Sequence, residues 1–516
     1  MNYECCKNTQ QRVIYKHMNN MNTIWRLCIA AMVSAPCVLT FFLCPCFGAD
    51  SPKYEKKLGF IEVSKKNPRY FSFSDGTPYI PIGMNLCFPR PYFYDGTEND
   101  AFEKLEEQMA RLSKNGGNFV RVWVGADFFN VETKAGEYDA KKMERFKRYM
   151  DLARKYGLRV KLCMQHFRSV SENEPDTCDA TRLRNQFRQP AYAKLFRNME
   201  EYVTSERGKK LYLGYTQNFA SHYAEDPYVF GIELWNEMNT VSSKIEAVQK
   251  WTAEILPRVK KQFPHHLVMQ SLGSFDSSRG IKNYKLIMPM ASNEVAQIHR
   301  YLDCGAPFKI CHGPVDIFCA DAIDFLLANA PGKPALLSES GAVNPKHTGP
   351  FNLYAKDTEG VILHDILFAP FFSGSAGAGQ TWFWEWYVAK NNLYWHFGRF
   401  AKAIGGINPL EENFVPFRFE HEGIRFYALK GKKTILLWAR DAQSDWRSEL
   451  ERGEKPRKLC AISLPISKLP GGVKPLSVSY YDPWTEASGK LKQNSGRIDL
   501  PEFSRSIVLR MELSGL

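Results

Sequence analysis

The sequence of 516 residues lacks the patterns that mark nucleic-acid-binding and nucleotide-binding proteins. It has no run of five or six basic residues, no zinc-finger spacing and no glycine-rich phosphate loop, although 68 Lys and Arg against 55 Asp and Glu give a net charge of +13. The basic residues are spread along the chain, which is typical of an ordinary soluble surface; attraction to acidic polysaccharide or to a membrane surface is the alternative. We therefore expect no nucleic-acid partner.

The sequence also lacks CxxC pairs and Cys/His clusters with metal-ligand spacing. Six of its 13 cysteines lie in the first 49 residues, and the other seven are scattered. Cys304 and Cys311 could close a short loop if the protein is exported, and the remaining five are typical of buried thiols. These absences predict that the protein holds no metal and no cofactor.

The first 49 residues differ in composition from everything after them. Lys16 and Arg26 precede an apolar run, 27–49, that ends in small residues, after which the chain turns polar. This order is typical of a secretory signal, and an uncleaved membrane anchor is the alternative because the run approaches the length of a spanning helix. We therefore expect a secreted or periplasmic protein, attached to a membrane only if this leader is kept.

Residues 50–408 alternate between apolar runs of strand length and helical patterns. A small hairpin around the turn 74–78 comes first. Eight apolar runs follow, the first ending near Asn85 and the others at 116–124, 158–167, 228–237, 266–274, 295–302, 334–341 and 377–387. Helical patterns separate most of them, at 100–115, 139–157, 209–224, 242–262, 316–329 and 361–371, with a final one at 391–405.

Alternating strands and helices predict a parallel sheet, and eight units of this length fit a closed (β/α)8 TIM barrel. A doubly wound open sheet is the alternative. Such a sheet normally has a glycine-rich turn after its first strand, and the segment "GMNLCFPRP" that follows here is not one. The α/β barrel is therefore the predicted fold.

Residues 409–516 have a different pattern, with short alternating runs separated by turn residues and no helix-length pattern apart from a doubtful stretch at 443–452. This pattern predicts a small all-β, sandwich-like domain. No low-complexity linker precedes it, so it should pack directly on the barrel and support it. We expect the aromatic residues Trp446, Tyr480 and Trp484 to be exposed, and they leave a sugar-binding role for this domain open.

Polar and aromatic residues gather at the C-terminal ends of the predicted strands, where a (β/α)8 barrel carries its chemistry. In chain order they are Asn85, Arg121, Trp123, His166, Asn236, Glu237, His299, Tyr301, Glu339, Trp382 and Trp384. Each one alone has a structural explanation, such as a core histidine or a glutamate at a helix dipole. Two carboxylates from different strands, together with an arginine, two histidines and a tyrosine, are what retaining glycoside hydrolysis requires.

The two acids in such a reaction need different environments. One must stay protonated to donate to the leaving oxygen, while the other must stay ionised to attack the anomeric carbon, and a nearby arginine stabilises its charge. Glu233 lies deeper in the strand that ends at Glu237, where side chains fill the barrel interior. We therefore expect Glu233 to be structural and to need a partner for its charge.

Over residues 70–405 these motifs give the sequence a clear resemblance to a known family. The segment "GIELWNEMN" resembles the strand-four signature of the glycoside hydrolases called clan A, and "GGNFVRVWV", "HRY" and "LLSESG" narrow the resemblance to glycoside hydrolase family 5, the cellulase and mannanase family. The resemblance implies that Glu237 is the acid/base and Glu339 the nucleophile. It also implies that Asn236 binds the sugar hydroxyl next to the anomeric carbon.

The same resemblance implies substrate-binding roles for the residues at the other strand ends, namely Arg121, His166, His299 and Tyr301. The tryptophan that floors the sugar site falls on Trp384 or Trp382, because the run "TWFWEW" leaves the register open. One departure from the family is Ser340, since the residue after the nucleophile is commonly aromatic or aliphatic.

The resemblance implies a retaining enzyme that cleaves a β-linked glycan, β-mannan or β-glucan, with a polysaccharide or oligosaccharide as substrate and no cofactor. A transglycosylase or a glycoconjugate β-glycosidase on the same barrel is the alternative. A non-catalytic carbohydrate-binding protein is a weaker one, because both carboxylates are present. The sequence does not set the oligomeric state, and we take a monomer as the expectation.

Overall fold

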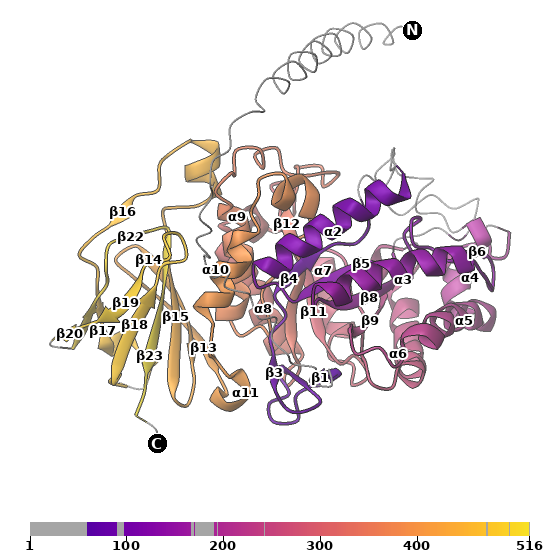
Figure 1. Cartoon of the computed structure of the whole chain (residues 1–516), viewed down its shortest axis with the longest axis horizontal. Helices are drawn as coiled ribbons and strands as arrows, with labels where there is room; N and C mark the ends of the chain where they lie inside the picture. The colour runs from indigo at the N-terminus through magenta and orange to yellow at the C-terminus, as the bar shows by residue number, and fades with distance from the viewer. Residues whose placement is uncertain are drawn as a thin grey trace, which may run out of the picture. The chain divides into compact units, whose positions relative to one another are not determined.

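The parallel strands predicted between residues 83 and 342 form the wall of a barrel in the computed structural model (Figure 1). The structure describes residues 59–514 apart from 90–96, 167–169, 171–189, 193, 242, 471–472 and 495. The predicted leader, 1–49, lies outside the described residues. Over the described part of the chain, no helix has the length and apolar character needed to cross a membrane.

Among the described residues, seven parallel strands build the barrel: β4 (Gly83–Asn85), β5 (Phe119–Trp123), β8 (Arg159–Gln165), β9 (Val229–Trp235), β10 (Leu267–Met269), β11 (Ala296–Leu302) and β12 (Ala335–Ala342). The strands β4, β5, β8, β9 and β10 pair in that spatial order, and β11 pairs with β12. Thr381 takes the place of the eighth strand, because it bridges in parallel to Met84 of β4 and to Ser340 of β12. The predicted (β/α)8 barrel is confirmed.

The predicted eighth strand, 377–387, differs from the expectation in its second half. The N–H of Trp382 still donates to the carbonyl of Ser340 at 2.7 Å, but the N–H of Trp384 turns back to the carbonyl of Trp382 at 2.8 Å. The chain then enters the π-helix η4 (Trp384–Ala389). The prediction that Trp384 lies on a strand is therefore wrong, because a local turn takes the hydrogen bond that a neighbouring strand would have received.

Helices cover the outside of the barrel (Figure 1). They are α2 (Glu98–Lys114), α3 (Ala140–Lys155), α4 (Met199–Thr204), α5 (Glu206–Tyr223), α6 (Ile245–Gln262), α7 (Ser278–Ile287), α8 (Val315–Asn329), α9 (Val361–Phe372) and α10 (Trp395–Ala403). Local chemistry sets their starts: Thr97 and Asp100 form a capping box before α2, and the Asp139 side chain caps α3. The sequence reading missed α4 and α7, which are short and leave little room for a periodic pattern.

A small antiparallel sheet lies at the N-terminal end of the barrel. Its strands are β1 (Ile61–Val63), β2 (Phe71–Phe73) and β3 (Pro78–Tyr79), as the predicted hairpin required. Phe71 and Tyr79 pack in one buried cluster with the residues that begin the barrel strands, such as Phe119 and Leu267. This end of the barrel is therefore filled with apolar side chains, and the polar residues lie at the other end.

The C-terminal region is all-β, as predicted. A six-stranded antiparallel sheet has the order β13-β14-β15-β23-β18-β19, with β13 (Val415–His421), β14 (Ile424–Lys430), β15 (Thr434–Asp441), β18 (Ser477–Tyr481), β19 (Ser488–Leu491) and β23 (Ser506–Glu512). Smaller sheets pair β17 (Ser463–Pro465), β21 (Arg497–Asp499) and β20 (Gln493–Asn494), and β16 (Lys458–Leu459) with β22 (Phe503–Ser504). Side chains such as Phe426, Leu437, Leu464 and Ile498 share one buried core, which gives the layered arrangement of a sandwich.

The six-stranded sheet packs directly against the barrel helices, and the described residues of both belong to one compact unit. The ring of Trp438 lies 5.8 Å from that of Phe368 on α9, and Arg440 forms a buried ion pair with Asp365 at 2.8 Å. The domain boundary at 408 and 409 stays a prediction. Trp446, expected as an exposed aromatic, is 3% exposed and packs on Phe351, so that expectation is wrong for this residue.

The cysteine predictions are partly settled. Cys304 and Cys311 are free thiols in the structure, so the loop that they could close is not linked. The Sγ atom of Cys311 lies 3.7 Å from the carbonyl oxygen of Phe275. Cys87, Cys163 and Cys319 are buried thiols, as expected, whereas Cys460 is exposed.

Candidate active site

Arg121 is the hub of the polar residues inside the barrel. It lies on β5, is fully buried, and donates hydrogen bonds to oxygen atoms of four residues from other strands or strand ends. Its Nη1 atom lies 2.7 Å from Oε2 of Glu339 and 3.0 Å from Oδ1 of Asn85. Its Nη2 atom lies 2.6 Å from Oδ1 of Asn236 and 2.6 Å from Oε1 of Glu233. One guanidinium thus fixes the positions of two carboxylates and two amides.

Glu339, on β12, is 4% exposed and accepts hydrogen bonds on both carboxylate oxygens. The hydroxyl of Tyr301 donates to Oε1 at 2.5 Å, and Arg121 donates to Oε2. Burial raises the pKa of Tyr301 well above its ordinary value, and the charge of Glu339 adds to this effect. The phenol therefore stays protonated and available as a donor to a charged carboxylate.

Glu237 follows β9 and has a backbone φ of 53° and ψ of 47°, the left-handed region that a glutamate rarely adopts. Its N–H donates to Oγ of Ser271 at 3.1 Å, and its side chain is 12% exposed. Oε1 lies 2.8 Å from Nδ1 of His299. Strained backbone of this kind is concentrated at functional sites, where the surrounding structure holds a side chain in one direction.

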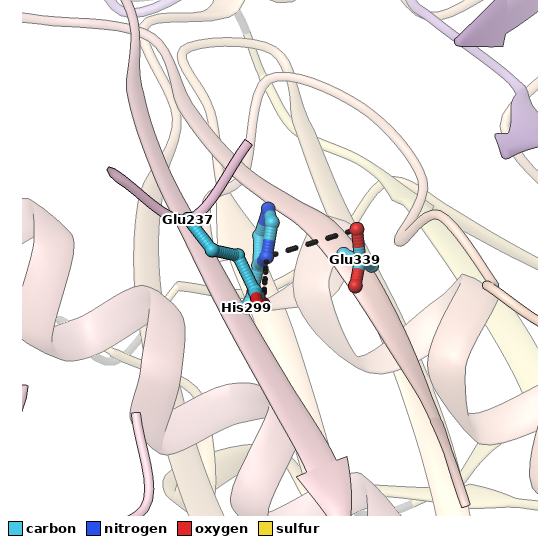
Figure 2. A group of neighbouring side chains, drawn as sticks. All are labelled: Glu237, His299 and Glu339. Atoms are coloured by element: carbon cyan, nitrogen blue, oxygen red, sulfur yellow. Dashed lines mark hydrogen bonds and ion pairs between the residues drawn. The ribbon is translucent and has the colours of Figure 1, made fainter. Parts of the chain in front are cut away.

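Glu237, His299 and Glu339 point toward one another (Figure 2). Carboxylate oxygens of the two glutamates and a ring nitrogen of His299 all lie within 4.8 Å of one another. Retaining glycosidases hold their two carboxyl groups about 5–5.5 Å apart, and inverting ones about 6.5–9.5 Å apart. The spacing of this pair fits a double displacement.

Aromatic rings line the side of the site next to β5 and η4. The ring of Trp123 stacks on His166 at 4.8 Å and lies 4.9 Å from Trp382. Trp382 in turn lies 5.1 Å from Trp384, and Phe88 lies 5.1 Å from Trp384. Both candidate tryptophans therefore belong to this aromatic wall, and Phe88 is a member that the sequence reading missed.

The predicted partner of the buried Glu233 is present. Arg121 holds both of its carboxylate oxygens, and Lys161 of β8 lies 3.2 Å from Oε2. Burial alone would raise the pKa of Glu233, but the charges of Arg121 and Lys161 outweigh burial and hold it well below the ordinary value. Lys161 was missed, although a lysine inside an otherwise apolar strand was a signal that a buried anion faces it.

A second polar group lies beside Tyr301. His347 has a left-handed backbone with φ of 52°, its Nδ1 lies 2.8 Å from Oδ2 of Asp303, and its ring lies 5.5 Å from that of Tyr301. Burial would lower the pKa of His347, but the hydrogen bond to Asp303 raises it overall. Nothing in the sequence pattern pointed to this pair, because His347 lies in a loop.

Two groups of side chains have ligand atoms spaced closely enough to hold a metal ion, among the residues that the structure describes. They are Glu237 with His299 and Glu339, and Asp276 with Asp303 and His347. In each group the histidine is already hydrogen-bonded to a carboxylate of the same group. The first group is the carboxylate pair itself, and its geometry also suits acid–base and nucleophilic chemistry.

A (β/α)8 barrel with two carboxylates, an arginine and a tyrosine at the C-terminal ends of its strands has the arrangement of a glycoside hydrolase. The comparison with family models then gives the family. Residues 74–362 match the model described as cellulase, glycosyl hydrolase family 5. The chain belongs to glycosyl hydrolase family 5, and it is a hydrolase that acts on the glycosidic bonds of a carbohydrate.

Solved structures share this fold. A glycoside hydrolase has a TM-score of 0.53 at 13% identity, over 89% of this chain and 98% of its own. A family 5 glycoside hydrolase from Bacteroides vulgatus ATCC 8482 has a TM-score of 0.52 at 13% identity, over 89% of this chain and 95% of its own. At such low identity the likeness shows the fold alone. The comparison with curated proteins finds no match.

Proposed function

We propose that this protein is a retaining glycoside hydrolase that cleaves a β-linked glycan by double displacement, with Glu339 as the nucleophile and Glu237 as the acid/base. The observation that carries the proposal is the spacing of the two carboxylates: one oxygen of each lies within 4.8 Å of the other and of a ring nitrogen of His299. Membership of glycosyl hydrolase family 5 supports the retaining mechanism.

The environment of Glu339 supports its role as nucleophile. Arg121 and Tyr301 each donate a hydrogen bond to a different oxygen of its carboxylate. The carboxylate that they hold in place attacks the anomeric carbon and forms the glycosyl-enzyme bond as the glycosidic oxygen leaves. When water later breaks that bond, the carboxylate is released and accepts the hydrogen bonds of the same two donors again.

The environment of Glu237 supports its role as acid/base. Its side chain is more exposed than that of Glu339, at 12% against 6%, so a leaving oxygen or a water molecule can reach it. It first gives its proton to the glycosidic oxygen and then takes a proton from the attacking water. His299 and the left-handed backbone keep the carboxyl group directed toward Glu339.

The substrate proposal is a β-mannan or a β-glucan. Flat aromatic faces such as Trp382 and Trp384 suit the apolar faces of hexose rings. Arg121 holds Oδ1 of Asn236, while Nδ2 of Asn236 is buried and has no hydrogen-bond partner among the described residues. That amide can donate to the hydroxyl next to the anomeric carbon. The description of the matched family, cellulase, agrees with this class of substrate.

The test is Glu339→Ala together with a product analysis. We expect the purified wild type to release product of retained anomeric configuration from a mannan or a glucan, followed by NMR. Glu339→Ala should lose activity on an aryl β-glycoside and regain turnover when azide is added, because azide replaces the missing nucleophile. Inverted product, or activity in Glu339→Ala without azide, would contradict the proposal. Transfer of the sugar to an added acceptor in preference to water would identify a transglycosylase instead.

We also propose that the protein is exported, on the basis of the leader pattern in residues 1–49. The measurement is cell fractionation with N-terminal sequencing of the mature protein. A protein found in the cytoplasm with its leader intact would contradict export.

A further inference from the structure

Four charged side chains form a buried network that reaches from the barrel interior to the candidate nucleophile. The side chains of Lys161, Glu233 and Arg121 are 0% exposed, and that of Glu339 is 6% exposed. Lys161 contacts Glu233 at 3.2 Å, Glu233 contacts Arg121 at 2.6 Å, and Arg121 contacts Glu339 at 2.7 Å. The order of charges along this network is positive, negative, positive, negative.

The strand register explains why the network needs Glu233. Arg121 of β5 and Lys161 of β8 are direct partners in the parallel ladder, so two like charges lie side by side in the barrel. Like charges on neighbouring strands repel each other, and burial makes the repulsion costly. Glu233 of β9 lies against both cations and accepts a further hydrogen bond from Oγ of Ser271 at 2.6 Å. The anion between the cations makes their burial possible.

Glu233 also sets the direction of the guanidinium. It takes Nε and Nη2 of Arg121 in a two-pronged arrangement, at 2.9 and 2.6 Å. This leaves Nη1 for Glu339 and Asn85. Without Lys161, the charge of Glu233 would cancel that of Arg121 and leave the charge of Glu339 unbalanced. Lys161 supplies a second positive charge, so that two cations balance two carboxylates. Lys161 is itself held by Oε1 of Gln297 at 2.8 Å.

We propose that Lys161 and Glu233 are a positioning pair that aims Arg121 at Glu339 and keeps the buried network electrically neutral while Glu339 is ionised. The pair touches no substrate and acts through Arg121. This inference rests on the proposed function, in which Glu339 is the nucleophile. It goes beyond that function by assigning a catalytic consequence to two residues at the floor of the site.

Three other titratable groups around the network, Cys87, Cys163 and Tyr301, add no charge to it. Burial raises the pKa of the Cys87 and Cys163 thiols well above the ordinary value, so both stay neutral. Tyr301 stays protonated for the same reason. Glu237, which follows β9, and His299 of β11 lie beside Glu339, and neither is changed in the variants below.

The test is a double-mutant cycle read out as the pH dependence of kcat/KM on a 4-nitrophenyl β-glycoside that the wild type cleaves. The acid limb of this profile reports the ionisation of the nucleophile in the free enzyme. Lys161→Met leaves one excess negative charge, so the acid limb should move up by about one pH unit. Glu233→Gln leaves one excess positive charge, so the acid limb should move to lower pH. The guanidinium of Arg121 also loses the partner that orients it, which should lower kcat/KM roughly 100-fold.

The double variant Lys161→Met with Glu233→Gln restores neutrality, so its acid limb should return toward that of the wild type. This variant also keeps the test decisive if Lys161→Met alone does not fold. The double variant differs from Glu233→Gln only at residue 161, so the difference between their acid limbs measures the effect of the Lys161 charge. The control is Val160→Ala, which removes buried volume from β8 without changing a charge and should leave the acid limb in place.

Two failures can be told apart. If the wild type cleaves no glycoside, or if Glu339→Ala keeps its activity without azide, the proposed function is wrong and this inference is overturned with it. If the wild type is active and azide rescues Glu339→Ala, but the acid limbs of the charge variants coincide with that of Val160→Ala, the inference alone is overturned. A merely structural role for Lys161 and Glu233 predicts that second result.

Discussion

The hydroxyl of Tyr301 lies 2.5 Å from Oε1 of Glu339, and the two residues belong to neighbouring strands, β11 and β12. This bond joins the phenol of one strand to the carboxylate of the next, through the oxygen Oε1, whereas Arg121 donates to Oε2. It gives Glu339 two donors and one fixed orientation. The relationship matters for the proposed role of Glu339, because a nucleophile must be both ionised and aligned with the anomeric carbon.

Tyr301→Phe should therefore lower kcat by about 100-fold with a smaller change in KM, because one donor to the proposed nucleophile is lost while the apolar ring stays. Steady-state kinetics on an aryl β-glycoside measure both constants. Tyr212→Phe is the matched control, since Tyr212 is also buried and donates a hydrogen bond to the carbonyl of Leu234 on β9. An equal loss of kcat in both variants would show that the Tyr301 effect is one of packing.

Glu237→Gln should separate substrates by their leaving groups. General acid catalysis contributes about 10²–10⁴-fold, and a substrate whose leaving group needs no proton does not use it. We expect kcat/KM on an unactivated oligosaccharide to fall by a factor in that range, while kcat/KM on a dinitrophenyl β-glycoside changes much less. A uniform loss on both substrates would contradict the acid/base role.

Trp382→Ala and Trp384→Ala should each raise KM by about 10-fold, because each removes a ring from the aromatic wall against which a sugar can pack. Trp386 offers a comparison within the same segment, since it lies on η4 and is 40% exposed. Trp386→Ala should raise KM less than the other two. Equal effects at all three positions would show that the tryptophans stabilise the segment and do not bind substrate.

Acid should destabilise the protein through its buried histidines. Burial lowers the pKa of His266 to about 4, although its hydrogen bond to the carbonyl of Asp226 works in the opposite direction. The unfolded chain takes up a proton on this residue below about pH 6.5 that the folded protein does not bind. The free energy of unfolding should therefore fall between about pH 6.5 and pH 4, by at most about 3 kcal/mol from His266.

The measurement is urea unfolding at a series of pH values for the wild type and for His266→Gln, which keeps a side-chain N–H donor. The variant should lose less stability over this interval than the wild type. Burial also lowers the pKa of His396, to about 3, so part of the acid loss remains in the variant. Parallel curves for the two proteins would contradict the assignment to His266.

Much of the fold could be predicted because capping residues and the spacing of apolar residues, both local features of the sequence, indicate where helices and strands form. The helix α2 begins at a capping box and has apolar residues such as Phe102, Leu105 and Met109 at helical spacing, so its bounds were close to those expected. The eighth strand was predicted too long, since the hydrogen bond of Trp384 depends on a turn that the apolar run does not encode. Short helices such as α7 were missed for lack of a long periodic stretch.

Apart from Trp384, the sequence by itself determined which residues lie at the ends of the barrel strands, because each apolar run stops at a polar or aromatic residue. It also indicated that Glu233 needed a partner, since a charge inside a strand cannot stay buried alone. Only the tertiary structure decided that the partners are Arg121 and Lys161, and that Glu237 lies beside Glu339. Arg121 and Glu339 are 218 residues apart in the chain, and no local pattern reports a contact over that distance. Barrel closure brings their strand ends together, and the carboxylate pair exists only after that closure.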